Sequence, residues 1–151
     1  ACQFLPRCER GFVLLNYMPV INGTVPMVTA APSITATHPV AAASAASYTR
    51  RGHTVLATSL EAAAGIDGLP GPALLVADAG IAECVLEDRV DPAAMVPGIE
   101  ALASEGWEVT VLVPAARMGA AHWGLRGSST VLQAWWPGPN ESIQFGAPQV
   151  P

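Results

Sequence analysis

The 151-residue sequence contains no lysine, and all seven of its basic residues are arginines. This absence excludes a lysine Schiff base, a lysine general base and a lysine contact to a phosphate group. Charged residues are also scarce: they make up 13% of the chain, against about 25% in a typical globular protein. Because hydrophobic residues reach 51%, the composition is that of a globular chain and not of a disordered one.

The chain also has no excess of positive charge: its net charge is −5. Nucleic-acid-binding proteins usually present a basic face, so we expect no nucleic-acid partner. No apolar run reaches the roughly 18 residues that a membrane-spanning helix needs, so we expect no membrane span. The length is that of one ordinary domain.

Only three cysteines are present, Cys2, Cys8 and Cys84. Their spacing matches no zinc or redox motif, and we expect no metal site. Two interpretations of Cys2 and Cys8 stay open. Reduced thiols are typical of a cytoplasmic protein, which is our prediction, whereas a disulfide between them would indicate a secreted one.

Segments that favour strands alternate with segments that favour helices through the middle of the chain. Apolar runs predict strands at 54–58, 73–77, 108–113 and 130–136. Capping residues, alanine-rich segments and helical spacing predict helices near 40–49, 59–64, 92–105 and 115–125. This alternation predicts an α/β domain in which a mostly parallel sheet is covered by helices, a Rossmann-like three-layer architecture with strands 54–58, 73–77 and 108–113 at its centre.

The two ends of the chain differ from this central pattern. Residues 1–11 carry turn formers and charges and are predicted to be an N-terminal arm. Residues 12–29 predict an N-terminal hairpin with Asn22-Gly23 at its turn. Residues 137–151 contain four prolines and are predicted to form an extended C-terminal tail. The single α/β domain is therefore expected to span residues 12–136.

The segment from Val28 to Leu56 resembles the opening of the ParA/MinD/ArsA-type P-loop ATPases. In that family a strand leads into a glycine-rich loop, an alanine-rich helix and a turn similar to Arg51-Gly52-His53-Thr54-Val55-Leu56, and Ala73–Gly80 would correspond to the second acidic strand. The loop Ala30–Thr37 departs from the family because it has neither glycine nor lysine. The resemblance therefore implies a degenerate P-loop unit, or a generic Rossmann-like one, that does not hydrolyse ATP.

Four residues near the ends of the predicted strands are candidate ligand-binding residues: Ser59, Asp78, Arg117 and His122. The carboxyl ends of parallel strands share one edge of a sheet, where ligands bind. Arg117 and His122, together with Arg126, could bind an anion, and Asp78 could bind a metal or a hydroxyl group. The alternatives are local: Ser59 as a helix cap, Asp78 as a cap or turn residue, and His122 as a packed surface histidine.

Two further groups of residues are ambiguous. Trp135 and Trp136 end the last predicted strand, either as core residues or as an anchor for a protein partner. The carboxylates Glu83, Glu87 and Asp88 fall near helical spacing, which predicts a solvated helical face and not a metal pair.

Low charge, proline-rich ends and missing catalytic signatures favour a non-catalytic α/β interaction or regulatory module. Such a module would act as a subunit of a larger assembly, with a protein partner or as a homo-oligomer, and without a cofactor. The alternative is an enzyme or ligand-binding domain that binds an anion or a nucleotide with the loops at the carboxyl edge of its sheet. The sequence leaves open whether the protein is an enzyme.

Overall fold

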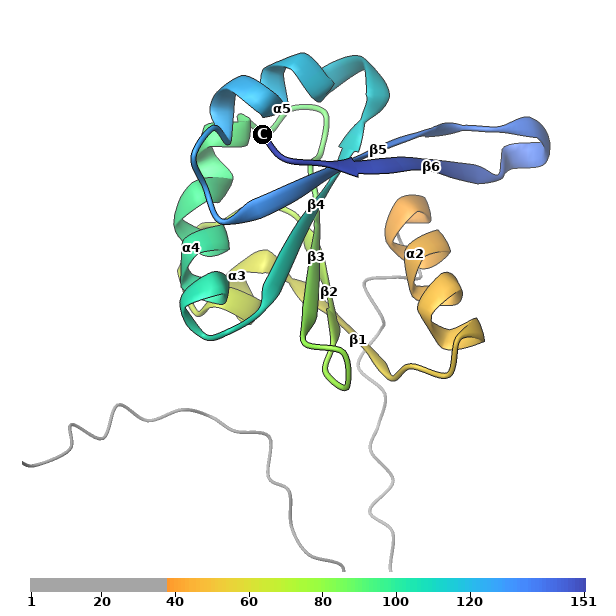
Figure 1. Ribbon diagram of the computed structural model, residues 1–151, viewed down its shortest axis with the longest axis horizontal. Coiled ribbons are helices and arrows are strands. Elements are labelled where there is room, and N and C mark those ends of the chain that lie inside the picture. Colours follow the sequence, from red (N-terminus) through yellow and green to blue (C-terminus); the bar gives the residue numbers. More distant parts are fainter. Residues whose placement is uncertain (1–37) are drawn as a thin grey trace, which may run out of the picture.

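A six-stranded mixed β-sheet organises residues 38–151, the part of the chain that the computed structural model describes (Figure 1). The strands lie side by side in the order in which they occur along the chain: β1 (Val55–Ser59), β2 (Pro72–Val76), β3 (Ile81–Val85), β4 (Glu108–Pro114), β5 (Thr130–Pro137) and β6 (Ile143–Gln149). The predicted arm, the predicted hairpin at 12–29, the loop Ala30–Thr37, Cys2 and Cys8 all lie outside the described residues.

The prediction of a mostly parallel, Rossmann-like sheet is wrong. Three of the five strand pairings, β1–β2, β2–β3 and β5–β6, are antiparallel, and only β3–β4 and β4–β5 are parallel. The predicted strands at 54–58 and 73–77 therefore do not run parallel to each other, and β1 lies at an edge of the sheet and not at its centre. The outcome is a mixed, strand-rich sheet.

The length of α3 (Leu60–Ala64) explains why β1 and β2 are antiparallel. A five-residue helix advances only about 7.5 Å, whereas a five-residue strand spans about 17 Å. Helix α3 is therefore too short by itself to carry the chain back along β1, and residues 65–71 return the chain to the end of β1, where Pro72 pairs with Ser59. A true crossover does occur between β3 and β4, where the connection includes the nine-residue helix α4 (Val96–Ser104) and the 3₁₀ turn η1 (Pro92–Met95).

Strand β3 follows β2 after a short turn and was not predicted. The turn spans Ala77–Gly80, and Gly80 adopts a positive φ of 67°. Because so short a connection can only form a hairpin, β3 runs antiparallel to β2. The expectation of a helical face for Glu83, Glu87 and Asp88 is therefore wrong, since Glu83 lies in a strand and the other two in the loop after it.

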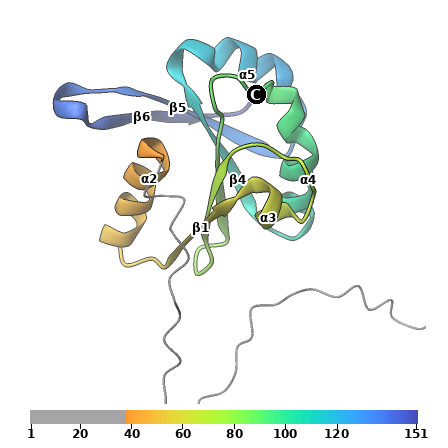
Figure 2. The same cartoon turned by 180° about the vertical axis from the view of Figure 1, so that it is seen from behind.

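Helices cover both faces of the sheet, and the two views in Figures 1 and 2 agree on their arrangement. Helix α2 (Pro39–Arg50) lies on one face, where Val40 and Ala41 pack against Leu74, Val85 and Leu112. The other face carries α3, α4 and α5 (Met118–Gly124), which enclose the larger hydrophobic cluster. Its fully buried side chains include Leu60, Met95, Ile99, Leu102, Val111, Leu125 and Leu132.

The predicted extended tail at 137–151 is replaced by strand β6, which folds back along β5. Residues Asn140 and Glu141 at the tip both have positive φ values, 57° and 59°, which suits the tight reversal of the chain. The resulting hairpin projects past the beginning of α2 (Figure 1). None of the helices formed by residues 38–151 is long and apolar enough to cross a membrane.

Candidate functional site

The carboxyl ends of β1, β3, β4 and β5 meet at one edge of the sheet, together with the beginning of α2. Two neighbouring cavities of about 380 and 240 Å³ open there, and His38 and Glu87 line both of them. Ser59 and Glu61 line the first cavity, and Trp135 lines the second. Of the four predicted ligand-binding residues, only Ser59 lines either cavity.

Ser59 acts as the N-cap of α3. Its hydroxyl oxygen accepts a hydrogen bond from the backbone N–H of Ala62 at 3.1 Å, which satisfies one of the free N–H groups at the start of the helix. The alternative of Ser59 as a helix cap thus accounts for its geometry, and its hydroxyl oxygen already accepts a hydrogen bond.

Arg117 holds the loop that follows β3. Its guanidinium group donates hydrogen bonds to the backbone carbonyl oxygens of Glu87 and Val90, the latter at 2.7 Å. These bonds tie the end of β4 to the loop leading into η1. Two donors of the Arg117 guanidinium therefore face protein carbonyl groups, and this side chain holds the loop in place.

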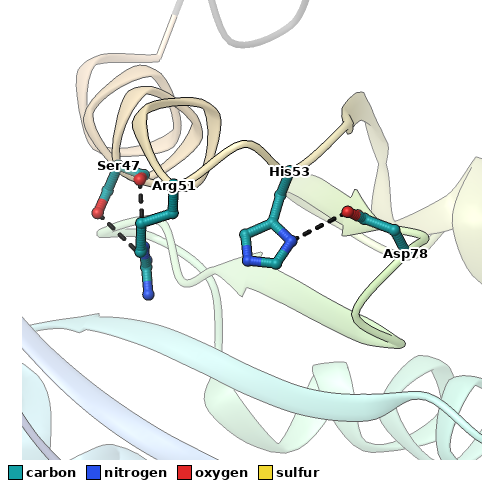
Figure 3. A network of polar contacts seen from close by, with 4 residues as sticks. All are labelled: Ser47, Arg51, His53 and Asp78. Atoms are coloured by element: carbon teal, nitrogen blue, oxygen red, sulfur yellow. Dashed lines mark hydrogen bonds and ion pairs between the residues drawn. The ribbon is translucent and has the colours of Figure 1, made fainter.

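Asp78 lies at the opposite edge of the sheet, because β2 runs antiparallel to β1 and β3. Its Oδ2 atom is 3.0 Å from Nδ1 of His53, which comes from the segment between α2 and β1 (Figure 3). The hydrogen bond from His53 lowers the pKa of Asp78 below its ordinary value. The structure therefore separates Asp78 from Ser59 and Arg117, and the four predicted ligand-binding residues form no common site.

Sequence reasoning missed the most buried carboxylate among the described residues. Glu83 is 4% exposed and faces α2, where the Ser44 hydroxyl donates to one carboxylate oxygen. The Tyr48 hydroxyl donates to the other at 2.8 Å. The signal available in the sequence was the Asp78-Ala79-Gly80 turn followed by β-branched residues at 81 and 85, a pattern typical of a hairpin.

Tyr48 connects this buried carboxylate to the surface. Its burial, followed by the negative charge of Glu83, raises the pKa of the Tyr48 hydroxyl well above its ordinary value, so Tyr48 remains a neutral donor. The Arg51 guanidinium lies 4.6 Å from the centre of the Tyr48 ring, and the His53 ring meets it edge-on at 5.9 Å. Tyr48, Glu83 and Ser44 together fasten α2 to the sheet.

A third cavity, of about 340 Å³, lies between α5 and the end of β6 and is lined by Gly119, His122, Trp123, Arg126 and Pro151. His122 Nε2 is 3.1 Å from Oε1 of Gln149. Trp123 is 79% exposed, and so is Val150, which precedes Pro151. His122 and Arg126, two of the three residues predicted to bind an anion, are therefore neighbours of a strongly exposed indole.

The two adjacent tryptophans of β5 have different environments. Trp135 is half-buried and packs with Ile143 and Phe145 against the hydrophobic cluster between α2 and the sheet. Its indole Nε1 is buried and has no hydrogen-bond partner in the described part of the chain. Trp136 is 42% exposed and lies close to Gly146 of β6. Trp135 is therefore partly buried against the core, whereas Trp136 leaves more of its indole exposed.

Cys84 is fully buried on the face opposite to Glu83, and burial raises the pKa of its thiol to about 12. A thiol of this kind is a packing residue and not a nucleophile. Within residues 38–151, no group of three or more His, Cys, Asp or Glu side chains is placed to hold a metal ion.

No protein-family model, curated protein or solved structure matches this chain. The resemblance to P-loop ATPases therefore stays a prediction.

Proposed function

We propose that this domain acts by association and not by catalysis, and that β1 pairs with β1 of a second copy. One observation carries the proposal: β1 is an edge strand of residues 38–151 and lacks the charges and prolines that protect many sheet edges. Its sequence, Val-Leu-Ala-Thr-Ser, contains no charge and no proline. Leu56 leaves 46% of its side chain exposed. Such an edge is a template for further strand pairing.

The other edge of the same sheet supports this interpretation by contrast. Strand β6 contains Pro148, which has no N–H group to donate. The pairing of β5 with β6 is irregular between Gln133 and Trp135. Prolines and irregular pairing are both means by which proteins block strand addition at an edge. Within residues 38–151, the fold thus protects the β6 edge and leaves the β1 edge unpaired.

The candidate ligand residues add support of a different kind. Ser59 and Arg117 are engaged in local hydrogen bonds, and Asp78 is at the far edge of the sheet. An antiparallel β1–β1 pair around a two-fold axis would instead use the free backbone groups and cover Leu56 on both copies. Because five residues give a small interface, we expect a dimer that dissociates in the micromolar range.

Sedimentation velocity on the full chain between about 1 and 200 μM tests the proposal, a range chosen around micromolar affinity. We expect a concentration-dependent dimer that Leu56→Lys abolishes, because the substitution places a charge on the pairing strand of both copies. Val150→Lys is the matched control: it also replaces an exposed apolar side chain, but away from β1, and it should leave the dimer intact. A monomer at every concentration would overturn the proposal.

A further inference from the structure

We infer that the charges beside the two ends of β1 set the direction and the register of the strand pair. In this arrangement the two-fold axis passes through Ala57, and Glu61 of each copy lies against the basic segment of the other, residues 50–53 (Arg-Arg-Gly-His). The inference rests on the proposed pairing of β1 with a second copy, and it adds the residues that decide how the two strands align. Two independent observations support it: the direction of the backbone N–H groups of β1, and the opposite charges at its two ends.

The hydrogen bonds between β1 and β2 indicate which backbone groups of β1 face the open edge. The N–H group of Leu60 donates to the carbonyl oxygen of Gly71 at 2.8 Å, and Ser59 lies opposite Pro72, which has no N–H group. Ser59 therefore belongs to a non-hydrogen-bonded pair. Because the two kinds of pair alternate along an antiparallel ladder, every second residue of β1 does the same. Three residues thus direct their backbone N–H groups away from β2: Val55, Ala57 and Ser59.

One two-fold register pairs all three of these residues. When the axis passes through Ala57, this residue lies opposite its own copy, and Val55 lies opposite Ser59 of the second copy. Moving the axis to the residue on either side leaves one of the three without a β1 residue opposite it. The backbone therefore favours the axis at Ala57, where the two Cα atoms of a hydrogen-bonded pair would be about 5.5 Å apart.

The beginning of β1 is basic. The basic segment contains two arginines and His53, and it connects α2 to β1. Arg50 and Arg51 are exposed, and the guanidinium of Arg51 lies over the Tyr48 ring. Asp78, whose carboxylate is 3.0 Å from His53 (Figure 3), offsets only one of the charges of the segment.

The end of β1 is acidic. Glu61 follows it in the first turn of α3, where its side chain is exposed and forms no ion pair within residues 38–151. Glu87 lines the same cavity as Glu61 and adds negative charge at this end. Continuing the register beyond the strands places His53 opposite Glu61 of the second copy, once at each end of the interface.

These charges favour an antiparallel partner over a parallel one. An antiparallel pair brings each basic segment next to a carboxylate, whereas a parallel pair would bring the two basic segments together and the two Glu61 side chains together. Like charges opposite each other destabilise a strand pair, and complementary charges fix its register. The β1 edge is therefore self-complementary in one direction only.

Sedimentation velocity on charge-reversed full chains tests the ion pairs. At an ionic strength of about 20 mM, where charges are weakly screened, Glu61→Arg should raise the dissociation constant of the dimer about tenfold or more. This effect should shrink at about 0.5 M salt. Glu141→Arg is the matched control, because it reverses an exposed carboxylate on the turn between β5 and β6 and should leave the dimer unchanged.

A mixing experiment separates an ion pair between copies from a structural role of Glu61 in α3. The double variant Arg50→Glu, Arg51→Glu should also dimerise poorly by itself. An equimolar mixture of this variant with Glu61→Arg should recover the affinity of the parent chain, because both ends of the heterodimer again carry opposite charges. Damage to α3 could not be repaired in this way.

Disulfide formation tests the register. In a chain with Cys2→Ser and Cys8→Ser, Ala57→Cys should form a disulfide-linked dimer on mild oxidation, because Cα atoms about 5.5 Å apart suit a disulfide. Val55→Cys is the matched control. Its two copies would be four residues apart along the strands, more than about 13 Å, and should not be linked.

The outcomes distinguish the inference from the proposed function. A parent chain that stays monomeric at every concentration would overturn both. A parent dimer would overturn the inference alone in any of three cases: if Glu61→Arg does not weaken it, if mixing the two charge-reversed chains does not restore it, or if Val55→Cys is linked as readily as Ala57→Cys.

Discussion

The hydroxyl group of Tyr48 donates a hydrogen bond to the carboxylate of Glu83 at 2.8 Å, across 35 residues of sequence. Tyr48 belongs to α2 and Glu83 to β3, so this bond joins a helix to the middle of the sheet. Ser44, one turn earlier in α2, donates to the same carboxylate. A buried carboxylate with two hydroxyl donors fixes how α2 sits on the sheet, because a shift of the helix would leave the carboxylate unpaired.

Removing either donor should destabilise the fold. We expect Tyr48→Phe and Ser44→Ala each to lower the free energy of unfolding by about 1–3 kcal/mol, since a buried oxygen of Glu83 loses its partner. Urea denaturation measures this change. Thr49→Ala is the control in the same helix, because the Thr49 hydroxyl donates to the Ala45 carbonyl on the exposed side, and it should change stability by less than about 0.5 kcal/mol. Equal effects of all three variants would contradict the assigned role of Glu83.

The same contact should be visible in the titration of Tyr48. Burial and the charge of Glu83 raise the pKa of the Tyr48 hydroxyl, so Glu83→Gln should lower this pKa while burial keeps it above that of an exposed tyrosine. Ultraviolet absorbance of tyrosinate against pH measures the change. The chain has two tyrosines, Tyr17 and Tyr48, and Tyr48→Phe assigns the signal. An unchanged titration in Glu83→Gln would show that the carboxylate charge does not act on Tyr48.

The contact between His53 and Asp78 should make stability depend on pH in the acid range. Because the folded-state pKa of Asp78 lies below its ordinary value of 3.8, the carboxylate stabilises the fold above that pH. The contribution is lost as the pH falls through the lower folded-state pKa. Asp78→Asn should therefore be less stable than the parent chain at neutral pH, and the difference should disappear in strong acid. Thermal unfolding across this range measures it, and a difference that persists at low pH would exclude this origin.

Gly71 should be the least replaceable of the loop glycines. It has a φ of 103°, and a Cβ atom there would meet the carbonyl oxygen of Val85 at 2.8 Å. Gly68 also has a positive φ, 81°, but nothing lies near its would-be Cβ atom. Gly68→Ala should cost only the conformational penalty of about 1–2 kcal/mol. Gly71→Ala should lower the free energy of unfolding by clearly more, as measured by urea denaturation. Equal losses in the two variants would mean that the Val85 carbonyl group moves aside.

Much of the local structure could be predicted from the sequence. Pro39 at the first turn and the alanine-rich segment after it predicted α2, and the apolar runs predicted β1, β2, β4 and β5 to within a few residues. The helical spacing that ends at Gly106 likewise predicted α4, which ends at Ser104. These predictions were confirmed because propensity, capping and apolar runs act over a few residues.

The candidate site could not be predicted in the same way. A common site for Ser59, Asp78, Arg117 and His122 requires that all strands of the sheet run in the same direction. One reversed strand moved Asp78 to the other edge, and the guanidinium of Arg117 is engaged by two backbone carbonyl oxygens. The near-helical spacing of Glu83, Glu87 and Asp88 predicts a solvated helical face, and it gives no sign of the hydroxyl partners that Glu83 finds on α2.

The sequence by itself determined the positions of most elements, the scarcity of charge and the absence of lysine. Only the tertiary structure decided strand direction, because this depends on whether each connection is long enough to return along the previous strand. It also decided that residues 143–149 form β6, since the proline-rich end is a strand only when β5 lies beside it. Within residues 38–151, the edge position of β1, the pairing of Glu83 with α2 and the exposure of the Trp123 indole all depend on how segments far apart in the chain are arranged. Local propensity carries no information about such contacts.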